Sequence, residues 1–147
     1  MSTENPEKPR WQYRFDNYAR AFGLLREAIE TLSERELSQL EKEGVIKRFE
    51  YTWELAWKTL KDLLDDQGVV LATIAPKCVI KEAFAAKLIR HGDVWMDALD
   101  ARNKMSHVYN LRVFEAVITD IRVRFLNLFD ELHFDLLARV VSTNEHE

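Results

Sequence analysis

One short stretch of the sequence carries polar side chains whose types and order could do chemistry together. It spans residues 102–109 and reads Arg-Asn-Lys-Met-Ser-His-Val-Tyr. The imidazole of His107 can exchange protons near neutral pH, and the guanidinium of Arg102 can hold the charge of a phosphate group. Metal-independent cleavage of RNA, in which a ribose 2′-hydroxyl attacks its own phosphate, needs a base, an acid and such a cation. The stretch is therefore a candidate catalytic site.

The same stretch also has a purely structural interpretation. On an ideal helix Asn103 and His107 lie one turn apart on one face, whereas Arg102 and His107 differ by about 140°. If the helix ends near Val108, the cations of the stretch lie in a last helical turn, whose unpaired carbonyl groups favour positive charge. Spacing alone leaves both interpretations open.

Helical spacing of apolar residues organises the first half of the chain. The first predicted helix spans residues 11–32, where apolar side chains recur every three or four positions. Ser33 and Glu36 predict a capping box at the start of the second helix. This helix is predicted to span residues 34–67 and to end at Gly68, with Gly44 as a point where it could kink.

Three further helices are predicted in the second half. The apolar segment 68–75 has no partner strand and is predicted to be an extended connection packed across the end of the bundle. Pro76 suits the first position of the third helix, which is predicted to end at the Arg-His-Gly sequence of residues 90–92. Asp93 is the predicted cap of the fourth helix, which carries the candidate site, and Asn110 is that of the fifth.

These elements predict an all-α fold, an antiparallel up-down bundle of about five helices around a four-helix core. Residues 1–10 are predicted to form a flexible N-terminal tail, residues 11–141 a single helical domain, and residues 142–147 a polar C-terminal tail. Tyr51 and Leu55 widen the apolar stripe of the second helix beyond one face. We therefore expect a second buried surface, most simply a dimer contact.

Composition limits the class of protein. A net charge of −4 and a pI near 5.6 argue against a protein that coats nucleic acid non-specifically, so any RNA contact must be local.

Cys78 is the one cysteine, which excludes an intramolecular disulfide and suits a reducing cytoplasm; its apolar neighbours predict a buried thiol. His133 has acidic neighbours and is predicted to be solvated. No apolar run approaches the roughly 20 residues of a membrane span, so we expect a cytoplasmic protein with no membrane segment.

Sequence motifs for metal or nucleotide cofactors do not occur in the chain. It contains neither Cys-x-x-Cys nor His-Glu-x-x-His, and it has no Gly-rich phosphate loop. We therefore expect no metal site and no cofactor.

The order of residues in the candidate site resembles a known signature. The Arg-x4-His-x-Tyr pattern of Arg102, His107 and Tyr109, with Asn103 directly after the arginine, resembles that of the HEPN superfamily of small all-helical proteins. The run of residues 48–61, Arg-Phe-Glu-Tyr-Thr-Trp-Glu-Leu-Ala-Trp-Lys-Thr-Leu-Lys, is similar to that of one branch, the nucleotidyltransferase substrate-binding proteins related to HepT toxins. Further matching positions are Pro76 through Ile89, with Lys81-Glu82-Ala83-Phe84, and Trp95. The resemblance extends from about Tyr13 to about Leu137.

The resemblance implies a homodimer whose motif helices line a shared groove. In that groove His107 would be the acid and base, Arg102 would hold the phosphate, and Asn103 would orient them. Further binding residues of the groove would be Lys104, Ser106 and Arg112.

The resemblance also implies a biological role. The chain would be a toxin that cleaves RNA and is neutralised by a partner minimal nucleotidyltransferase of the MNT antitoxin type, which transfers AMP to Tyr109. Alternatively, the chain is a non-catalytic substrate-binding subunit of a two-component nucleotidyltransferase. Without this resemblance, Tyr109 would be predicted to be an amphipathic tyrosine whose ring is buried and whose hydroxyl is hydrogen-bonded.

Overall fold

The computed structural model describes residues 8–145, which fold into helices joined by short connections. The helices are α1 (Arg10–Glu34), α2 (Gln39–Asp66), α3 (Pro76–Ala85), α4 (Gly92–Met105), α5 (Leu111–Asp120), η1 (Ile121–Phe125) and α6 (Leu126–Glu145). Because α5, the π-helical segment η1 and α6 follow one another without a break, they form one long helical run. The prediction of an all-α bundle of about five helices is confirmed.

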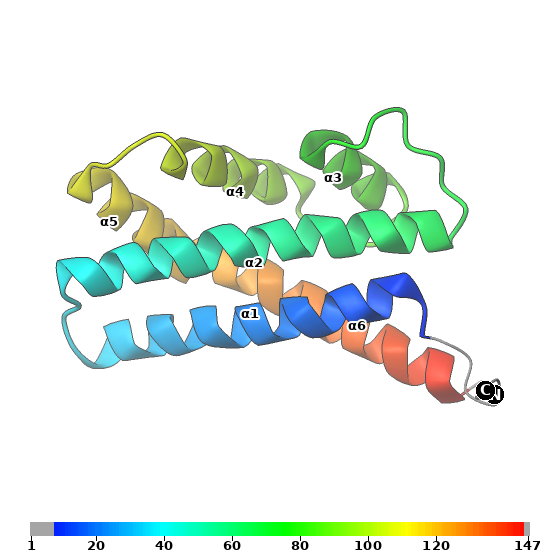
Figure 1. Ribbon diagram of the computed structural model, residues 1–147, viewed down its shortest axis with the longest axis horizontal. Coiled ribbons are helices and arrows are strands. Elements are labelled where there is room, and N and C mark those ends of the chain that lie inside the picture. Colours follow the sequence, from blue (N-terminus) through cyan, green and yellow to red (C-terminus); the bar gives the residue numbers. More distant parts are fainter. Residues whose placement is uncertain (1–7, 146–147) are drawn as a thin grey trace, which may run out of the picture.

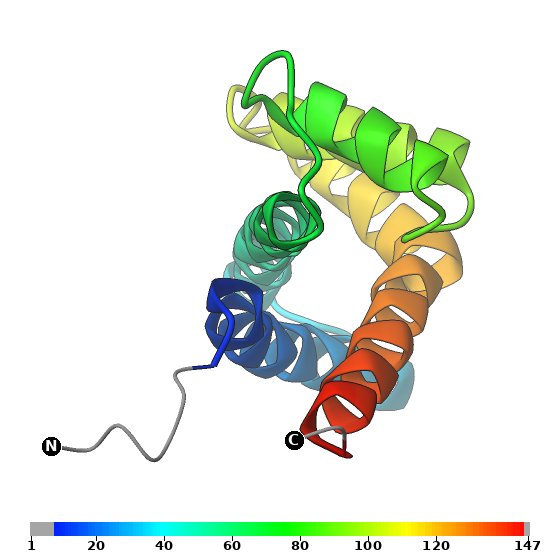
Figure 2. The same cartoon turned by 90° about the vertical axis from the view of Figure 1, so that its right-hand side faces the viewer.

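The helices form four sides of a bundle. The two long helices α1 and α2 lie antiparallel and side by side, and the run from α5 to α6 crosses them at an angle (Figure 1). The shorter α3 and α4 lie on the other side of α2, where they close the bundle (Figure 2). The largest fully buried side chains come from all four sides: Tyr18, Phe49, Trp53, Trp95, Phe125 and Phe129.

A buried hydrogen bond joins α1 to α6 inside this core. The Tyr18 hydroxyl donates to the carbonyl oxygen of Phe129 at 2.7 Å, which satisfies the polar end of a fully buried ring. Burial raises the pKa of the Tyr18 phenol well above its ordinary value. The tyrosine therefore remains neutral and keeps its proton for this bond.

The start of α2 differs from the prediction. Ser33 lies inside α1 and its Oγ donates to the carbonyl oxygen of Ile29 at 3.2 Å. The cap is Ser38, whose Oγ accepts from the backbone N–H of Glu41 at 3.1 Å, while Glu41 Oε1 accepts from the Ser38 N–H at 2.9 Å. The capping box predicted at Ser33 is therefore formed five residues later, where the sequence repeats the same Ser-x-x-Glu pattern.

One glycine ends α2 as predicted, and another lies inside the helix without interrupting it. Gly68 has a φ of +79° directly after the helix, and the Val69 N–H donates to the Leu64 carbonyl at 2.9 Å, so the helix ends in the left-handed stop that was predicted. Gly44 lies within α2, which continues through it from Gln39 to Asp66.

Helix α3 ends earlier than predicted, so the connection from α3 to α4 is longer. Part of this connection packs into the core. The third helix ends at Ala85, and Lys87 takes a left-handed conformation with a φ of 61°. Leu88 and Ile89 follow it and are buried. The fourth helix then begins at Gly92 after His91, which also has a positive φ, so Asp93 lies in the first turn and is not the cap.

Three side chains or segments are packed differently from the predictions. His133 is half-buried, and its ring centroid lies 5.6 Å from that of Phe15 and 5.9 Å from that of Phe22. Cys78 is only partly buried. The connection after α2 packs Val69 and Leu71 against the core but leaves Val70 92% exposed.

Parts of the two expected tails lie outside residues 8–145, which the structure describes. Residues 1–7 of the expected N-terminal tail and residues 146–147 of the expected C-terminal tail lie outside the described residues. Residues 142–145 belong to α6. No helix among the described residues is long and apolar enough to cross a membrane.

Candidate functional site

The candidate site lies at the end of α4 and in the turn that leads to α5. The helix ends at Met105, which is buried and fixes this end to the core. His107 follows in a turn, where its backbone N–H donates to the Lys104 carbonyl at 3.1 Å. The predicted helix end near Val108 is therefore too late, and His107 lies outside the helix.

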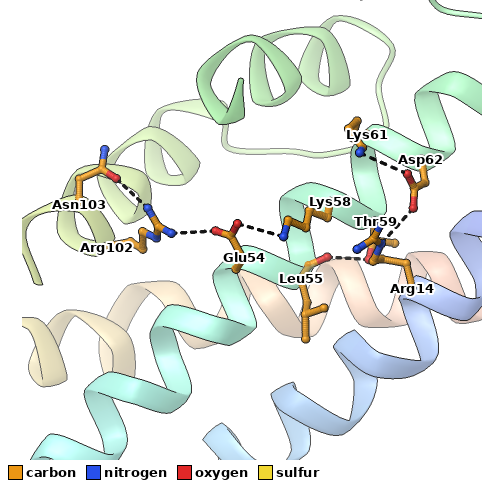
Figure 3. Close-up of polar contacts among 9 residues, drawn as sticks. All are labelled: Arg14, Glu54, Leu55, Lys58, Thr59, Lys61, Asp62, Arg102 and Asn103. Carbon is orange, nitrogen blue, oxygen red and sulfur yellow. Dashed lines mark hydrogen bonds and ion pairs between the residues drawn. The ribbon is translucent and has the colours of Figure 1, made fainter. Parts of the chain in front are cut away.

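Arg102 reaches from α4 to α2. Its Nη2 donates to Glu54 Oε2 at 2.9 Å, and the other carboxylate oxygen, Oε1, lies 3.4 Å from Lys58 Nζ (Figure 3). The Arg102 side chain is 30% exposed and that of Glu54 is 28% exposed. The guanidinium is thus partly sheltered from water and directed by a carboxylate from another helix.

Asn103 also contacts the guanidinium. The Arg102 Nη1 donates to Asn103 Oδ1 at 3.3 Å, which is long for a hydrogen bond (Figure 3). Among the described residues, Arg102 Nε is buried and has no hydrogen-bond partner. The arginine therefore keeps unused hydrogen-bonding capacity beside its bond to Glu54.

The remaining predicted groove residues are all exposed. The Ser106 hydroxyl donates to the Arg102 carbonyl at 3.3 Å, within its own helical turn. Lys104 lies in the last turn of α4, where its charge suits the helix dipole. Arg112 lies in the first turn of α5, and its backbone N–H donates to Asn110 Oδ1 at 2.9 Å, which confirms Asn110 as the predicted cap.

Tyr109 is almost fully exposed to solvent. Its side chain is 90% exposed, so the interpretation as an amphipathic tyrosine with a buried ring is wrong. His107, two residues earlier, is also exposed. A nucleic acid or a protein partner can therefore reach both side chains from solvent.

The structure brings only part of the predicted set together. Arg102 and Asn103 are in contact, and Ser106 touches the backbone of Arg102. Within residues 8–145 no hydrogen bond joins the His107 imidazole to Arg102 or Asn103. One chain thus places a partly ordered guanidinium and a single exposed imidazole in this stretch.

Sequence reasoning missed Glu54 as a partner of Arg102. The pairing of Glu54 with Lys58 one turn later was visible in the sequence. Its link to Arg102 was not, because 48 residues separate the two and only the packing of α4 on α2 joins them. Among the described residues, no group of three or more His, Cys, Asp or Glu side chains could hold a metal ion.

Comparison with known proteins identifies the family. A family profile described as nucleotidyltransferase substrate binding protein like matches residues 13–138. The chain belongs to this family. The resemblance seen in the tryptophan-rich helix and the Arg-x4-His-x-Tyr stretch is therefore confirmed, and both lie inside the matched range.

One solved structure gives a second line of support for this family fold. It is described as the crystal structure of ttk003001694 from Thermus thermophilus, and it is 29% identical to this nucleotidyltransferase substrate-binding-like chain. The similarity covers 83% of this chain and 97% of that one, with a TM-score of 0.64. Comparison with curated protein sequences gives no match.

Proposed function

We propose that this chain is a toxin that cleaves RNA without a metal ion, acts as a homodimer, and is neutralised by a partner nucleotidyltransferase. The partner transfers AMP to Tyr109. The observation that carries the proposal is the exposure of Tyr109, at 90%, two residues after the exposed His107. This exposure leaves the phenol oxygen open to a partner enzyme, which a modification site requires.

Each chain contributes half of the cleavage machinery. In the dimer, two His107 imidazoles and two Arg102 guanidiniums face one groove across a two-fold axis. One imidazole takes the proton of the ribose 2′-hydroxyl, whose oxygen then attacks the neighbouring phosphorus. The other gives a proton to the 5′-oxygen as its bond to phosphorus breaks, which leaves a cyclic phosphate. Arg102 stabilises the charge that develops on the phosphate oxygens.

Modification of Tyr109 would switch this reaction off. The phenol oxygen attacks the α-phosphorus of ATP held by the partner, pyrophosphate leaves, and the phenol proton passes to solvent. The product carries bulk and negative charge two residues from His107. Both effects oppose the approach of an RNA phosphate.

Intact mass measurement tests this proposal directly. The chain is purified after expression alone and after co-expression with a minimal nucleotidyltransferase, and its peptides are mapped. We expect whole AMP units on Tyr109 only when the partner is present, and RNA cleavage only by the unmodified chain. Tyr109→Phe should stay unmodified beside the partner, and Tyr13→Phe is its matched control because Tyr13 is also an exposed tyrosine. AMP on Tyr13, or an unmodified chain with full partner activity, would contradict the proposal.

A second candidate is a substrate-binding subunit without catalysis of its own. It is favoured by the pairing of Arg102 with Glu54, which offsets the positive charge of the arginine, and by the name of the family. In that case the chain binds the nucleotidyltransferase tightly, stays unmodified and causes no growth arrest when expressed alone. Acute toxicity of the lone chain, lost in His107→Ala, would rule this candidate out.

A further inference from the structure

The contact between Arg102 and Glu54 is the one polar link that ties the candidate site to α2 within residues 8–145. It joins Arg102 Nη2 to Glu54 Oε2 at 2.9 Å across 48 residues of sequence (Figure 3). The second carboxylate oxygen of Glu54 lies 3.4 Å from Lys58 Nζ. Glu54 is thus held between two cations, which fixes its own direction as well as that of the guanidinium.

This contact restricts an otherwise flexible side chain. An arginine has five N–H donors in a rigid plane, so one short charge-assisted bond at Nη2 limits the rotation of the whole group. The bond to Asn103 at 3.3 Å is too long to do this alone. Because both side chains are about two-thirds covered, water competes less for the bond than it would at an open surface.

We infer that Glu54 is a positioning residue, which holds the guanidinium of Arg102 in the direction needed to meet the scissile RNA phosphate. The inference rests on the proposed ribonuclease function, since it assigns Glu54 a part in that reaction. Glu54 does not touch the substrate. It orders the Arg102 side chain before the phosphate binds, so that little conformational entropy is lost when the phosphate binds.

This role has an unusual consequence for binding and turnover. The Glu54 carboxylate repels RNA phosphates, so its neutralisation should leave RNA binding unchanged or tighter. The same change releases the guanidinium and should slow the chemical step. A residue that only stabilised the fold would instead lower the amount of folded protein and leave the turnover of the folded part unchanged.

The experiment compares Glu54→Gln with Glu50→Gln on the purified full chain. Glu50 lies one turn earlier on α2, so its replacement removes the same charge without touching Arg102. We expect kcat for an RNA oligonucleotide to fall about 10- to 100-fold in Glu54→Gln, with no rise in KM. We expect no change in kcat for Glu50→Gln. An equal kcat in the two variants, or a loss in Glu54→Gln that appears only as a higher KM, would overturn the inference.

A measurement without RNA separates this inference from the proposed function. Side-chain NMR signals of Arg102 are assigned by comparison with Arg102→Lys. Restricted rotation should give separate signals for the two Nη groups in the wild type, and these should merge in Glu54→Gln but not in Glu50→Gln. Unchanged signals in Glu54→Gln overturn the positioning role even if the chain cleaves RNA. If the wild type cleaves no RNA while the signals merge as expected, the ribonuclease function fails and Glu54 orders Arg102 in a binding groove only.

Discussion

The three motif side chains are close in sequence, but the fold orders only one of them. Arg102 is directed by a carboxylate from α2, whereas His107 and Tyr109 are exposed in the turn after α4. This arrangement suits the proposed function, in which a second chain completes the groove around an ordered guanidinium and an accessible imidazole. At the scale of single residues, the stretch therefore consists of one ordered side chain and two side chains that are open to solvent.

Replacing His107 by alanine should separate activity from folding. Because the side chain is exposed and makes no described hydrogen bond, His107→Ala should abolish RNA cleavage and change the free energy of unfolding by less than about 0.5 kcal/mol. Cleavage assays and urea unfolding check the two parts. His91→Asn is the control, since His91 is exposed and has a left-handed backbone that asparagine accepts. Cleavage that persists in His107→Ala would exclude the imidazole from the reaction.

At the scale of the elements, the start of α2 depends on Ser38. Ser38→Ala removes the acceptor for the Glu41 N–H and should lower the free energy of unfolding by about 1 kcal/mol. Ser33→Ala removes a hydroxyl that bonds only within α1, and should cost less. Urea unfolding of both variants checks the order. A larger loss in Ser33→Ala would show that the helix starts where the sequence first suggested.

The ion pair beside this cap predicts a pH dependence. Arg35 Nη1 donates to Glu41 Oε1 at 2.9 Å, and this bond, with the backbone N–H of Ser38, lowers the pKa of Glu41 from 4.5 to about 2. A lowered pKa in the folded state means that the stabilisation is complete above pH 4.5 and is lost as the pH falls toward 2. The difference in unfolding free energy between wild type and Glu41→Gln should therefore shrink over that range. Glu43→Gln is the control, because it removes an exposed carboxylate and leaves the bonds of Glu41 to Arg35 and Ser38 in place.

Two glycines of the α2 region should respond in opposite directions to alanine. A Cβ at Gly44 meets no atom within 4 Å, so Gly44→Ala should stabilise the helix by about 0.5–1 kcal/mol. Gly68 has a φ of +79°, so Gly68→Ala should destabilise the protein by about 1 kcal/mol. Urea unfolding measures both. A loss of stability in Gly44→Ala would indicate that the open space beside Gly44 is occupied in solution.

These elements show which features the sequence could predict. The left-handed stop at Gly68 and the cap at Asn110 were predictable because each depends on the chemistry of one residue and its neighbours. The start of α2 was not, because Ser33 and Ser38 head the same pattern and only packing selects between them. The packing of His133 on two rings of α1 needs tertiary contacts that periodicity does not contain. The same limit explains why the motif was found and its partner Glu54 was not.

At the scale of the whole molecule, one chain holds only half of the groups that the proposed ribonuclease mechanism uses. It holds a single motif imidazole, and the broad apolar stripe of α2 leaves Tyr51 and Leu55 only partly covered. A second copy placed over this region would cover the stripe and supply the second imidazole. The proposed ribonuclease mechanism therefore requires a dimer, and this requirement can be tested by mixing chains.

An excess of inactive chain should suppress the wild type. We expect that wild-type chain, unfolded and refolded with a ninefold excess of His107→Ala chain, loses about nine-tenths of its cleavage activity per wild-type molecule. The reason is that random pairing leaves only about one wild-type chain in ten with a wild-type partner, and every mixed dimer has one imidazole for two proton transfers. Refolding with the same excess of Glu43→Gln chain, which keeps both groups, should suppress nothing. Undiminished activity per wild-type molecule in the first mixture would mean that each chain acts alone, and the groove shared by two chains would have to be abandoned.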